Sequence, residues 1–310
     1  MNRRSLLKAA GALPLLSVTN PTLAAPQRAA RVLRFAYLGD THIQAERKPM
    51  QSLSNCLHHI QKQADKPSML LHGGDVIMDA LGQDRDRVQA QWTAWQQVMK
   101  ADNSLPIQYC IGNHDVWGFS GAKTDPMWGK KWVADQLQLN GRYRSFDWPA
   151  TGKNGWHFII LDSTQPDANG KWYTAHLDPE QLDWLKADLA KTDAKTPILI
   201  LSHIPIVSAT VFYDKQNVKE GNWLIPGSWN HTDATDLIEL FARHPNVKAC
   251  LSGHMHLLDH VTYNNVQYFC NGSVCGNWWA SDTYHQTKAG YALFDLYADG
   301  TLNRTYVSYE

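Results

Sequence analysis

The chain has 310 residues, and its 29 basic and 29 acidic side chains leave a formal net charge of zero. A chain of this length forms one large domain or two small ones, and either arrangement buries a sizeable core. The balanced charge argues against a broad polyanion-binding surface, so we expect no stable nucleic-acid partner.

The first 25 residues have the composition of an export signal. The paired Arg3 and Arg4 precede a short apolar stretch from Ala9 to Val18 and an alanine-rich end near Ala24. This order is typical of secretory signals. The stretch resembles the bacterial twin-arginine signal, which implies export of the folded protein by the twin-arginine machinery and a periplasmic or otherwise exported location.

Beyond residue 26, strand-like and helix-like segments alternate. Apolar runs that predict buried strands are VLRFAYL, SMLLHG, PIQYCI, TPILILS and VKACLS. Apolar residues at helical spacing predict helices at Pro49 to Ala64, Asp84 to Lys100, Met127 to Leu139, Pro179 to Ala190 and Thr232 to Arg243. This alternation favours an α/β layered fold whose central strands are mostly parallel.

From Leu257 onward the pattern changes to short runs separated by turn signals, which include Asn264-Asn265 and Ala298-Asp299-Gly300. These signals predict antiparallel hairpins, with the last one tight at Asp299-Gly300. No long linker or low-complexity stretch divides the chain, so we predict a single mature domain at residues 26–310.

Two stretches, near 116–155 and 205–231, look like insertions into that domain. Both are rich in aromatic residues and both directly follow candidate site residues, so we expect them to lie over the site. Trp117, Trp278 and Trp279 are the tryptophans that we expect close to it. The Trp278-Trp279 loop fits an aromatic wall on which a base or sugar stacks, and it fits plain packing equally well.

The five cysteines are an odd number, so at least one thiol is free or pairs between chains. Cys270 and Cys275 flank a short loop, and the sequence leaves open whether they form a disulfide. Their spacing matches no zinc-ribbon pattern, so the cysteines receive no metal role.

Five clusters of metal-liking residues follow the five apolar runs. They are Asp40-Thr41-His42, Gly74-Asp75, Gly112-Asn113-His114-Asp115, His203 and Gly253-His254-Met255-His256. Open α/β sheets bind ligands outside the carboxyl ends of their strands, so these clusters can meet around one site.

The residue types in the clusters point to metal-assisted hydrolysis. Carboxylates, a carboxamide and imidazoles without thiolates suit Zn, Mn, Fe or similar ions. An aspartate can bridge two ions, and a water shared by ions about 3.5 to 4 Å apart becomes a nucleophile near neutral pH. Each metal-bound histidine needs an acceptor on its other ring nitrogen, so we expect carbonyls or carboxylates behind them.

The ordered set resembles the signature of the calcineurin-like metallophosphoesterase superfamily: D-x-H, G-D, G-N-H-D, a histidine after a strand, and G-H-x-H. The resemblance implies a four-layer α/β/β/α sandwich of two mixed sheets with a dimetal site at one sheet edge. It implies that one ion is held by Asp40, His42, Asp75 and His256, and the other by Asp75 as bridge, Asn113, His203 and His254. It also implies that His114 faces the substrate and that Asp115 orients His114.

Within the superfamily, the compact chain and its Asn-His-Asp box look most like the bacterial cyclic-nucleotide phosphodiesterase branch. The stretch Val76 to Asp79 lacks the tyrosine of purple acid phosphatases. We predict an exported phosphoesterase with two divalent or trivalent ions (Mn, Fe or Zn). It hydrolyses small phosphomonoesters or phosphodiesters, nucleotide-like ones among them, by attack of a metal-bridging hydroxide. The alternatives are a nucleotide or lipid pyrophosphatase using the same site and a non-catalytic metal-binding module, and retention of His114 argues against the module.

Overall fold

The computed structural model describes residues 29–309 except 119–122, 151–154, 171, 214 and 281–282. The export signal predicted in residues 1–25 lies outside the described residues. Within them, no helix combines the length and the apolar character needed to span a bilayer.

The first sheet has five strands in the order β15-β14-β1-β2-β3. Their bounds are Arg31–Leu38 for β1, Met69–His72 for β2, Ile107–Tyr109 for β3, Gly290–Tyr297 for β14 and Leu302–Ser308 for β15. β1, β2 and β3 run parallel, whereas β14 and β15 join as antiparallel strands. The sheet is therefore mixed, with its parallel strands leading toward the candidate site residues.

The second sheet has six strands in the order β12-β13-β11-β8-β5-β4. Their bounds are Arg144–Trp148 for β4, Trp156–Ile160 for β5, Ile198–Leu201 for β8, Val247–Ser252 for β11, Val261–Tyr263 for β12 and Val266–Cys270 for β13. The four central strands are parallel and the two edge strands are antiparallel to their neighbours. This sheet is mixed in the same way.

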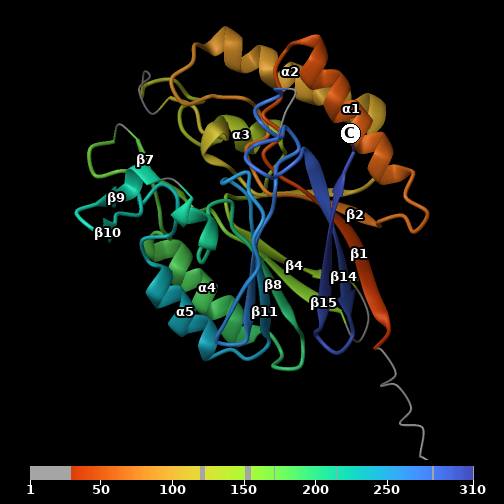
Figure 1. The fold of residues 1–310 in the computed structure, drawn as a ribbon, viewed down its shortest axis with the longest axis vertical. Helices are drawn as coiled ribbons and strands as arrows, with labels where there is room; N and C mark the ends of the chain where they lie inside the picture. The colour runs from red at the N-terminus through yellow and green to blue at the C-terminus, as the bar shows by residue number, and fades with distance from the viewer. Residues whose placement is uncertain are drawn as a thin grey trace, which may run out of the picture.

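Five α-helices accompany the sheets. They are α1 (Arg47–Gln61), α2 (Arg85–Asp102), α3 (Lys131–Gln136), α4 (Pro179–Lys191) and α5 (Ala234–Ala242). The side chain of Asp84 caps α2 by accepting from Arg87 N, and Asp178 caps α4 through Gln181 N. Figure 1 shows α1 and α2 on one side of the strands, with α4 and α5 on the other.

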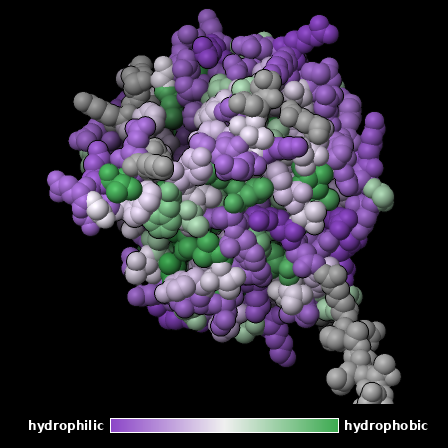
Figure 2. All heavy atoms as spheres, in the orientation of Figure 1, coloured by the Kyte–Doolittle hydropathy of each residue, from purple (hydrophilic) through white to green (hydrophobic). Residues whose placement is uncertain are grey.

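Short elements complete the described chain. They are the hairpin β6 (Thr164–Pro166) with β7 (Tyr173–Ala175), the hairpin β9 (Val218–Lys219) with β10 (Asn222–Trp223), and the 3-10 turns η1 (Asn113–Asp115), η2 (Ala209–Phe212) and η3 (Lys215–Asn217). Hydrophobic side chains of the β9–β10 region, such as Trp223 and Leu224, are exposed. Figure 2 shows several small hydrophobic patches scattered over an otherwise mostly hydrophilic face.

The two sheets face each other across a buried core. Phe35 of β1 stacks on Phe294 of β14 at 5.2 Å between ring centroids, and it meets Phe158 of β5 edge-on at 6.0 Å. A second apolar cluster joins α1 and α2 to the first sheet, and a third joins α4 and α5 to the second. The chain thus has a mixed α/β fold with two large mixed sheets and helices outside them.

Most predicted elements are present. All five apolar runs contain strands, and all five predicted helices form within a few residues of their expected bounds, except that α3 is shorter. The antiparallel hairpins of the tail are confirmed, with Asn264 and Asn265 in the left-handed region at φ 48° and 63° and Gly300 at φ 82°.

Residues 116–155 contain the predicted helix α3 and, in addition, a strand that the sequence pattern did not predict. This is the edge strand β4, which is antiparallel to β5. Phe146 of β4 stacks on its partner Phe158 of β5 at 4.9 Å, so cross-strand packing rather than local pattern defines the strand. Trp117 is also not a site residue, because it is buried edge-on against Trp132 and donates its indole N–H to Gln83 O.

All five cysteines are buried, free thiols. Cys270 and Cys275 therefore carry no disulfide in this structure, which settles the alternative that their spacing left open.

Candidate functional site

The five clusters meet at the carboxyl ends of strands from both sheets. The first sheet supplies Asp40 and His42 after β1, Asp75 after β2 and Asn113 after β3, and the second supplies His203 after β8 and the Gly253–His256 turn after β11. The side chains of Asp40, His42, Asp75 and His203 are almost completely buried. The packing of the sheets thus brings together residues as far apart as His42 and His256, which are separated by 214 positions.

One group of ring and carboxylate atoms forms around His42. Its Nε2 lies 3.1 Å from His256 Nε2 and 3.6 Å from Asp75 Oδ2. His256 Nε2 in turn lies 3.6 Å from Asp40 Oδ1. These four residues are the set that the resemblance implies for one ion.

A second group forms around His203. Its Nε2 lies 3.0 Å from Asn113 Oδ1 and 3.2 Å from Asp75 Oδ2. Ligand atoms of Asp75, His203 and His254 all lie within 4.8 Å of one another. Asp75 Oδ2 is therefore close to a ring nitrogen of both groups.

Backbone carbonyls orient the imidazoles. His203 Nδ1 lies 2.8 Å from Gly73 O, His42 Nδ1 lies 3.4 Å from Met78 O, and His256 Nδ1 lies 3.3 Å from Gly276 O. A carbonyl only accepts, so each Nδ1 carries a proton, and Nε2 is the nitrogen that a metal ion would bind. These are the acceptors that we expected behind metal-binding histidines.

The backbone at the site is strained. Five of the seven candidate ligands have left-handed backbone, with φ between 42° and 68°: Asp40, His42, Asp75, His254 and His256. Such a residue costs on the order of 1 to 2 kcal/mol unless it is glycine. Strain concentrated at one cluster indicates that function, rather than stability, determined these conformations.

Asp115 connects two of the site loops. Its carboxylate accepts hydrogen bonds from the backbone N–H groups of Asp75, Val76, Ile77 and Gly112 at 2.8 to 3.2 Å. A Cβ on Gly112 would lie 2.1 Å from Asp75 N, so only glycine allows this approach. Asp115 thus fixes the position of Asp75 relative to the Asn113 loop.

This arrangement differs from the role that we expected for Asp115. Its oxygens bind backbone N–H groups, while the carboxylate near the His114 ring is Asp79, whose Oδ1 lies 3.6 Å from Nδ1. The 3-10 turn η1 projects neighbouring side chains in different directions. Asp115 is therefore next to His114 in the sequence, but its carboxylate points away from the His114 ring. Sequence reasoning treated Asp79 only as part of a missing tyrosine motif.

The donor set fits cations. Asp40 Oδ2 is buried and finds no hydrogen-bond partner among the described residues, and two Nε2 lone pairs face each other at 3.1 Å. Burial raises the pKa of Asp40 to about 8, and burial lowers the pKa of His254 to about 3 and that of His256 to about 4. Unpaired oxygen and converging lone pairs are unfavourable alone and become favourable around a positive ion.

Cys275 lies on the far side of His256. Its Sγ is 3.8 Å from His256 Nδ1, whereas the Nε2 atom faces Asp40 and His42. Burial raises the pKa of the Cys275 thiol. The thiol therefore packs behind the imidazole and is not directed at the cluster of candidate ligands.

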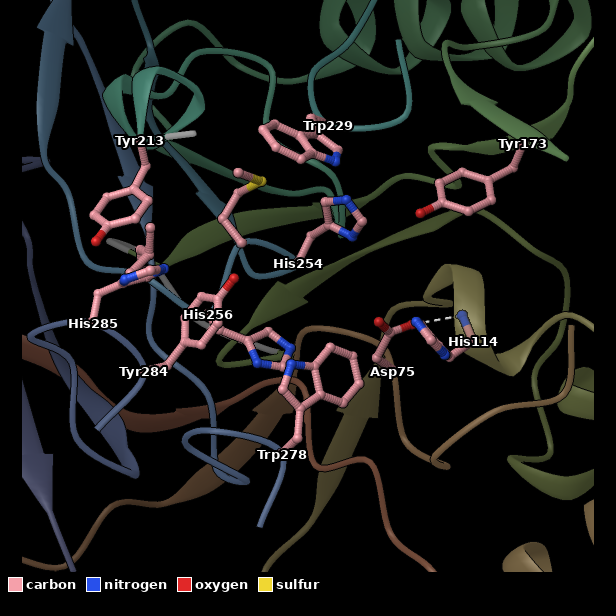
Figure 3. A pocket seen from close by; sticks show the side chains of 12 residues that line it. Asp75, His114, Tyr173, Tyr213, Trp229, His254, His256, Trp278, Tyr284 and His285 are labelled. Atoms are coloured by element: carbon pink, nitrogen blue, oxygen red, sulfur yellow. Dashed lines mark hydrogen bonds between the residues drawn. The ribbon is translucent and has the colours of Figure 1, made fainter. Parts of the chain in front are cut away.

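A pocket of about 470 Å³ opens over the clusters (Figure 3). Besides Asp75, His114, His254 and His256, its lining is mostly aromatic or apolar: Tyr173, Tyr213, Trp229, Met255, Leu257, Trp278, Tyr284 and His285. Tyr213 and Trp229 come from residues 205–231, as expected, whereas none of the described lining residues comes from 116–155. Sequence reasoning missed Tyr173, Tyr284 and His285, and the signal for the last two was their proximity to the Trp278 loop.

Comparison with known proteins agrees with this geometry. Residues 33–258 match the family described as Calcineurin-like phosphoesterase. A 3′,5′-cyclic-nucleotide phosphodiesterase of Nostoc is 23% identical over 279 residues, which cover 87% of this chain and 90% of that protein. A 3′,5′-cyclic adenosine monophosphate phosphodiesterase of Haemophilus influenzae is 22% identical over 254 residues, covering 81% and 78%.

The fold is also similar to that of a solved structure. The crystal structure of a dimetal phosphatase from Danio rerio has a TM-score of 0.62 at 15% identity, over 91% of this chain and 98% of that one. Since the family match spans well over half of the sequence, and includes every cluster described above, the chain belongs to the calcineurin-like phosphoesterase family, whose members depend on metal ions.

Proposed function

We propose that the protein is a dinuclear metal-dependent phosphoesterase that hydrolyses small, nucleotide-like phosphate esters. The observation that carries this proposal is the position of Asp75 Oδ2, 3.6 Å from His42 Nε2 and 3.2 Å from His203 Nε2. A single carboxylate oxygen between two ligand groups is what a bridging residue requires. Asp40, His42, Asp75 and His256 would hold one cation, and Asp75, Asn113, His203 and His254 the other.

Two bound cations would activate a water and offset charge on the phosphoryl oxygens. The protein's own contribution is position and proton supply. His114 lines the pocket beside Asp75, and its backbone N–H donates to Asp75 Oδ1 at 2.8 Å. Burial lowers the pKa of His114, but Asp75 and Asp79 raise it by more, which favours a protonated ring that can donate to the leaving alkoxide.

The packing of the apolar cores supports a specific layer order for the fold. The apolar core between the sheets, together with helices packed on each outer face, supports a four-layer α/β/β/α sandwich formed by one domain. Two relatives are named as phosphodiesterases of cyclic nucleotides, and this chain aligns with most of the length of each. Their names support a preference for phosphodiesters.

A substrate panel tests the function. Purified protein, stripped of metal and then reloaded with Mn, Zn or Fe, would be assayed with bis(p-nitrophenyl) phosphate, p-nitrophenyl phosphate, 3′,5′-cyclic AMP and a nucleoside diphosphate sugar. We expect turnover of the diesters that a chelator abolishes and metal restores. Two bound ions per chain with no turnover of any ester would favour a metal-binding module instead, and selective cleavage of the diphosphate would favour a pyrophosphatase.

We also propose that residues 1–25 direct export through the twin-arginine machinery, so that the enzyme meets its substrate outside the cytoplasm. The paired Arg3 and Arg4 and the alanine-rich end support this. Replacing both arginines by lysine is expected to keep the full-length precursor in the cytoplasm. An unchanged amount of processed protein in the periplasmic fraction would contradict the export route.

A further inference from the structure

Two consecutive tryptophans in the loop after β13 have opposite environments. Trp279 is 8% exposed and belongs to the core between the first sheet and its helices. Trp278 is 42% exposed and lines the pocket. Trp279 therefore anchors the loop, and Trp278 faces the site.

Trp279 is the anchor. Its indole N–H donates to His42 O at 2.8 Å, and its carbonyl accepts from Lys48 Nζ at 2.5 Å. Its backbone N–H donates to Cys275 O at 2.9 Å. These contacts tie the loop to the β1 site segment and to α1, so the neighbouring Trp278 has a defined position.

Trp278 lies against the candidate ligands. Its ring centroid is 4.3 Å from that of His42, 4.7 Å from His256 and 5.7 Å from His114. Figure 3 shows the indole at one side of the pocket, with Trp229 on the opposite side and His254 between them. A phosphate bound beside Asp75 and His114 would bring a substituent of the ester within reach of this indole.

The backbone supports a functional reading of this position. Trp278 and Trp279 have φ values of 52° and 65°, in the left-handed region that bulky residues rarely adopt. Two such residues in succession cost on the order of 1 to 3 kcal/mol each, and this cost persists only where the surrounding contacts impose it. This strained backbone conformation is the one that directs Trp278 into the pocket.

The rest of the pocket suits a flat, weakly polar group. Tyr213 and His285 are in ring contact at 3.6 Å between centroids, and Tyr284 meets His285 at 4.5 Å. These rings form a second aromatic wall. Aromatic faces bind planar rings better than they bind aliphatic groups of similar size, because ring stacking adds to the burial of apolar area.

We propose that Trp278 is a specificity-determining residue whose indole stacks on a planar aromatic group of the phosphate ester. This inference rests on the proposed function and deepens it. The aromatic group, rather than additional charge, then supplies the affinity that separates the preferred ester from simple alkyl esters.

The test uses phenylphosphonate and cyclohexylphosphonate, which share charge and approximate size but differ in planarity. Calorimetry on the metal-loaded full chain measures both Kd values without turnover, so its outcome is separate from that of the activity panel. We expect the wild type to bind phenylphosphonate about fivefold more tightly. Trp278→Leu should abolish the preference and weaken phenylphosphonate about tenfold, whereas Trp278→Phe should retain most of it.

Trp223→Leu is the matched control, because Trp223 is 41% exposed and does not line the pocket. It should leave both Kd values unchanged. A phenyl preference that survives in Trp278→Leu would overturn the proposal. So would loss of bound metal from Trp278→Leu at an unchanged melting temperature, since the indole would then serve to shield His42 and His256 rather than to select substrate.

Discussion

Histidines occupy two contrasting environments in this protein. At the carboxyl edge of the sheets, His42 and His256 are buried and His254 is partly buried, and desolvation lowers the pKa of each. Near the opposite end of β5, His157 lies between two carboxylates, with Nδ1 2.7 Å from Asp147 and Nε2 2.9 Å from Asp188.

The difference shows how one side chain acquires two functions. Burial lowers the pKa of His157 as well, but hydrogen bonds to Asp188 and Asp147 outweigh this and raise it. With both nitrogens donating to carboxylates, His157 has no lone pair to offer and acts as a structural cation. His42 and His256 instead donate Nδ1 to backbone carbonyls and keep Nε2 for a ligand.

The largest effect is expected from Asp75→Asn, which removes the charge shared by the two histidine groups. Two cations each supply several kcal/mol of transition-state stabilisation, so turnover should fall by about 10⁴-fold or more. Elemental analysis should show that the bound amount of both ions falls together. Normal metal content in this variant would contradict the bridging role of Asp75, because the edge histidines would then hold metal without their common carboxylate.

His114→Ala should leave both ions bound and still lower kcat by about 10³-fold, within the usual range for a positioned general acid. The effect should be largest for esters with poor leaving groups, because these need the proton most. Kinetics on two esters of different leaving-group pKa, with metal content measured in parallel, provide the check. An unchanged rate would remove His114 from catalysis.

Metal uptake should release protons. Burial raises the pKa of Asp40 to about 8, and the Asp75 and Asp40 carboxylates outweigh burial to raise that of His203 to about 9, so both groups hold a proton at pH 7 without metal. Ligation requires the deprotonated forms. Affinity should therefore rise about tenfold per pH unit for each proton released between pH 6 and 8. Titration heats that do not depend on the buffer's ionisation enthalpy would contradict this, and His157→Gln should behave as wild type.

Asp79→Asn should lower turnover about tenfold, as is usual for a residue that orients a functional group without contacting the reacting atoms. The reason is loss of the carboxylate 3.6 Å from His114 Nδ1. The basic limb of the pH–rate profile should move to lower pH, because the protonated imidazole is less favoured. Asp115→Asn offers the contrast: if Asp115 instead orients His114, it will shift the same limb.

The smallest effect is expected from His157→Gln, which should cost about 1 kcal/mol of unfolding free energy at pH 6 and leave turnover unchanged. Because the folded-state pKa of His157 is raised, its contribution is complete below about pH 6.5 and is lost as pH rises through the folded pKa. Urea unfolding at pH 6 and pH 9 measures the difference. An equal cost at both pH values would show that His157 stabilises by packing and not by charge.

Much of the site was predictable because its signals are local. Each apolar run ends at a cluster of metal-liking residues, and parallel strands place their carboxyl ends at a common edge. The positions of Asp40, Asp75 and His203 followed from this pattern. The strand β4 did not, since Arg144–Trp148 is an edge strand that depends on pairing with β5 and on stacking against Phe158.

By itself, the sequence determined the five strands that end at the site, the five helices and the tail hairpins, the residue types of the metal cluster and the family to which the chain belongs. Tertiary structure alone decided that Asp79 rather than Asp115 approaches the His114 ring, that Trp117 is core while Trp278 faces the pocket, and that His157 is held as a cation. The physical reason is the distance along the chain over which a sequence pattern is informative. Residue spacing reports only on neighbours within one helix or strand. Hydrogen bonds such as that between Trp279 and His42, 237 positions apart, form only when separate loops pack together.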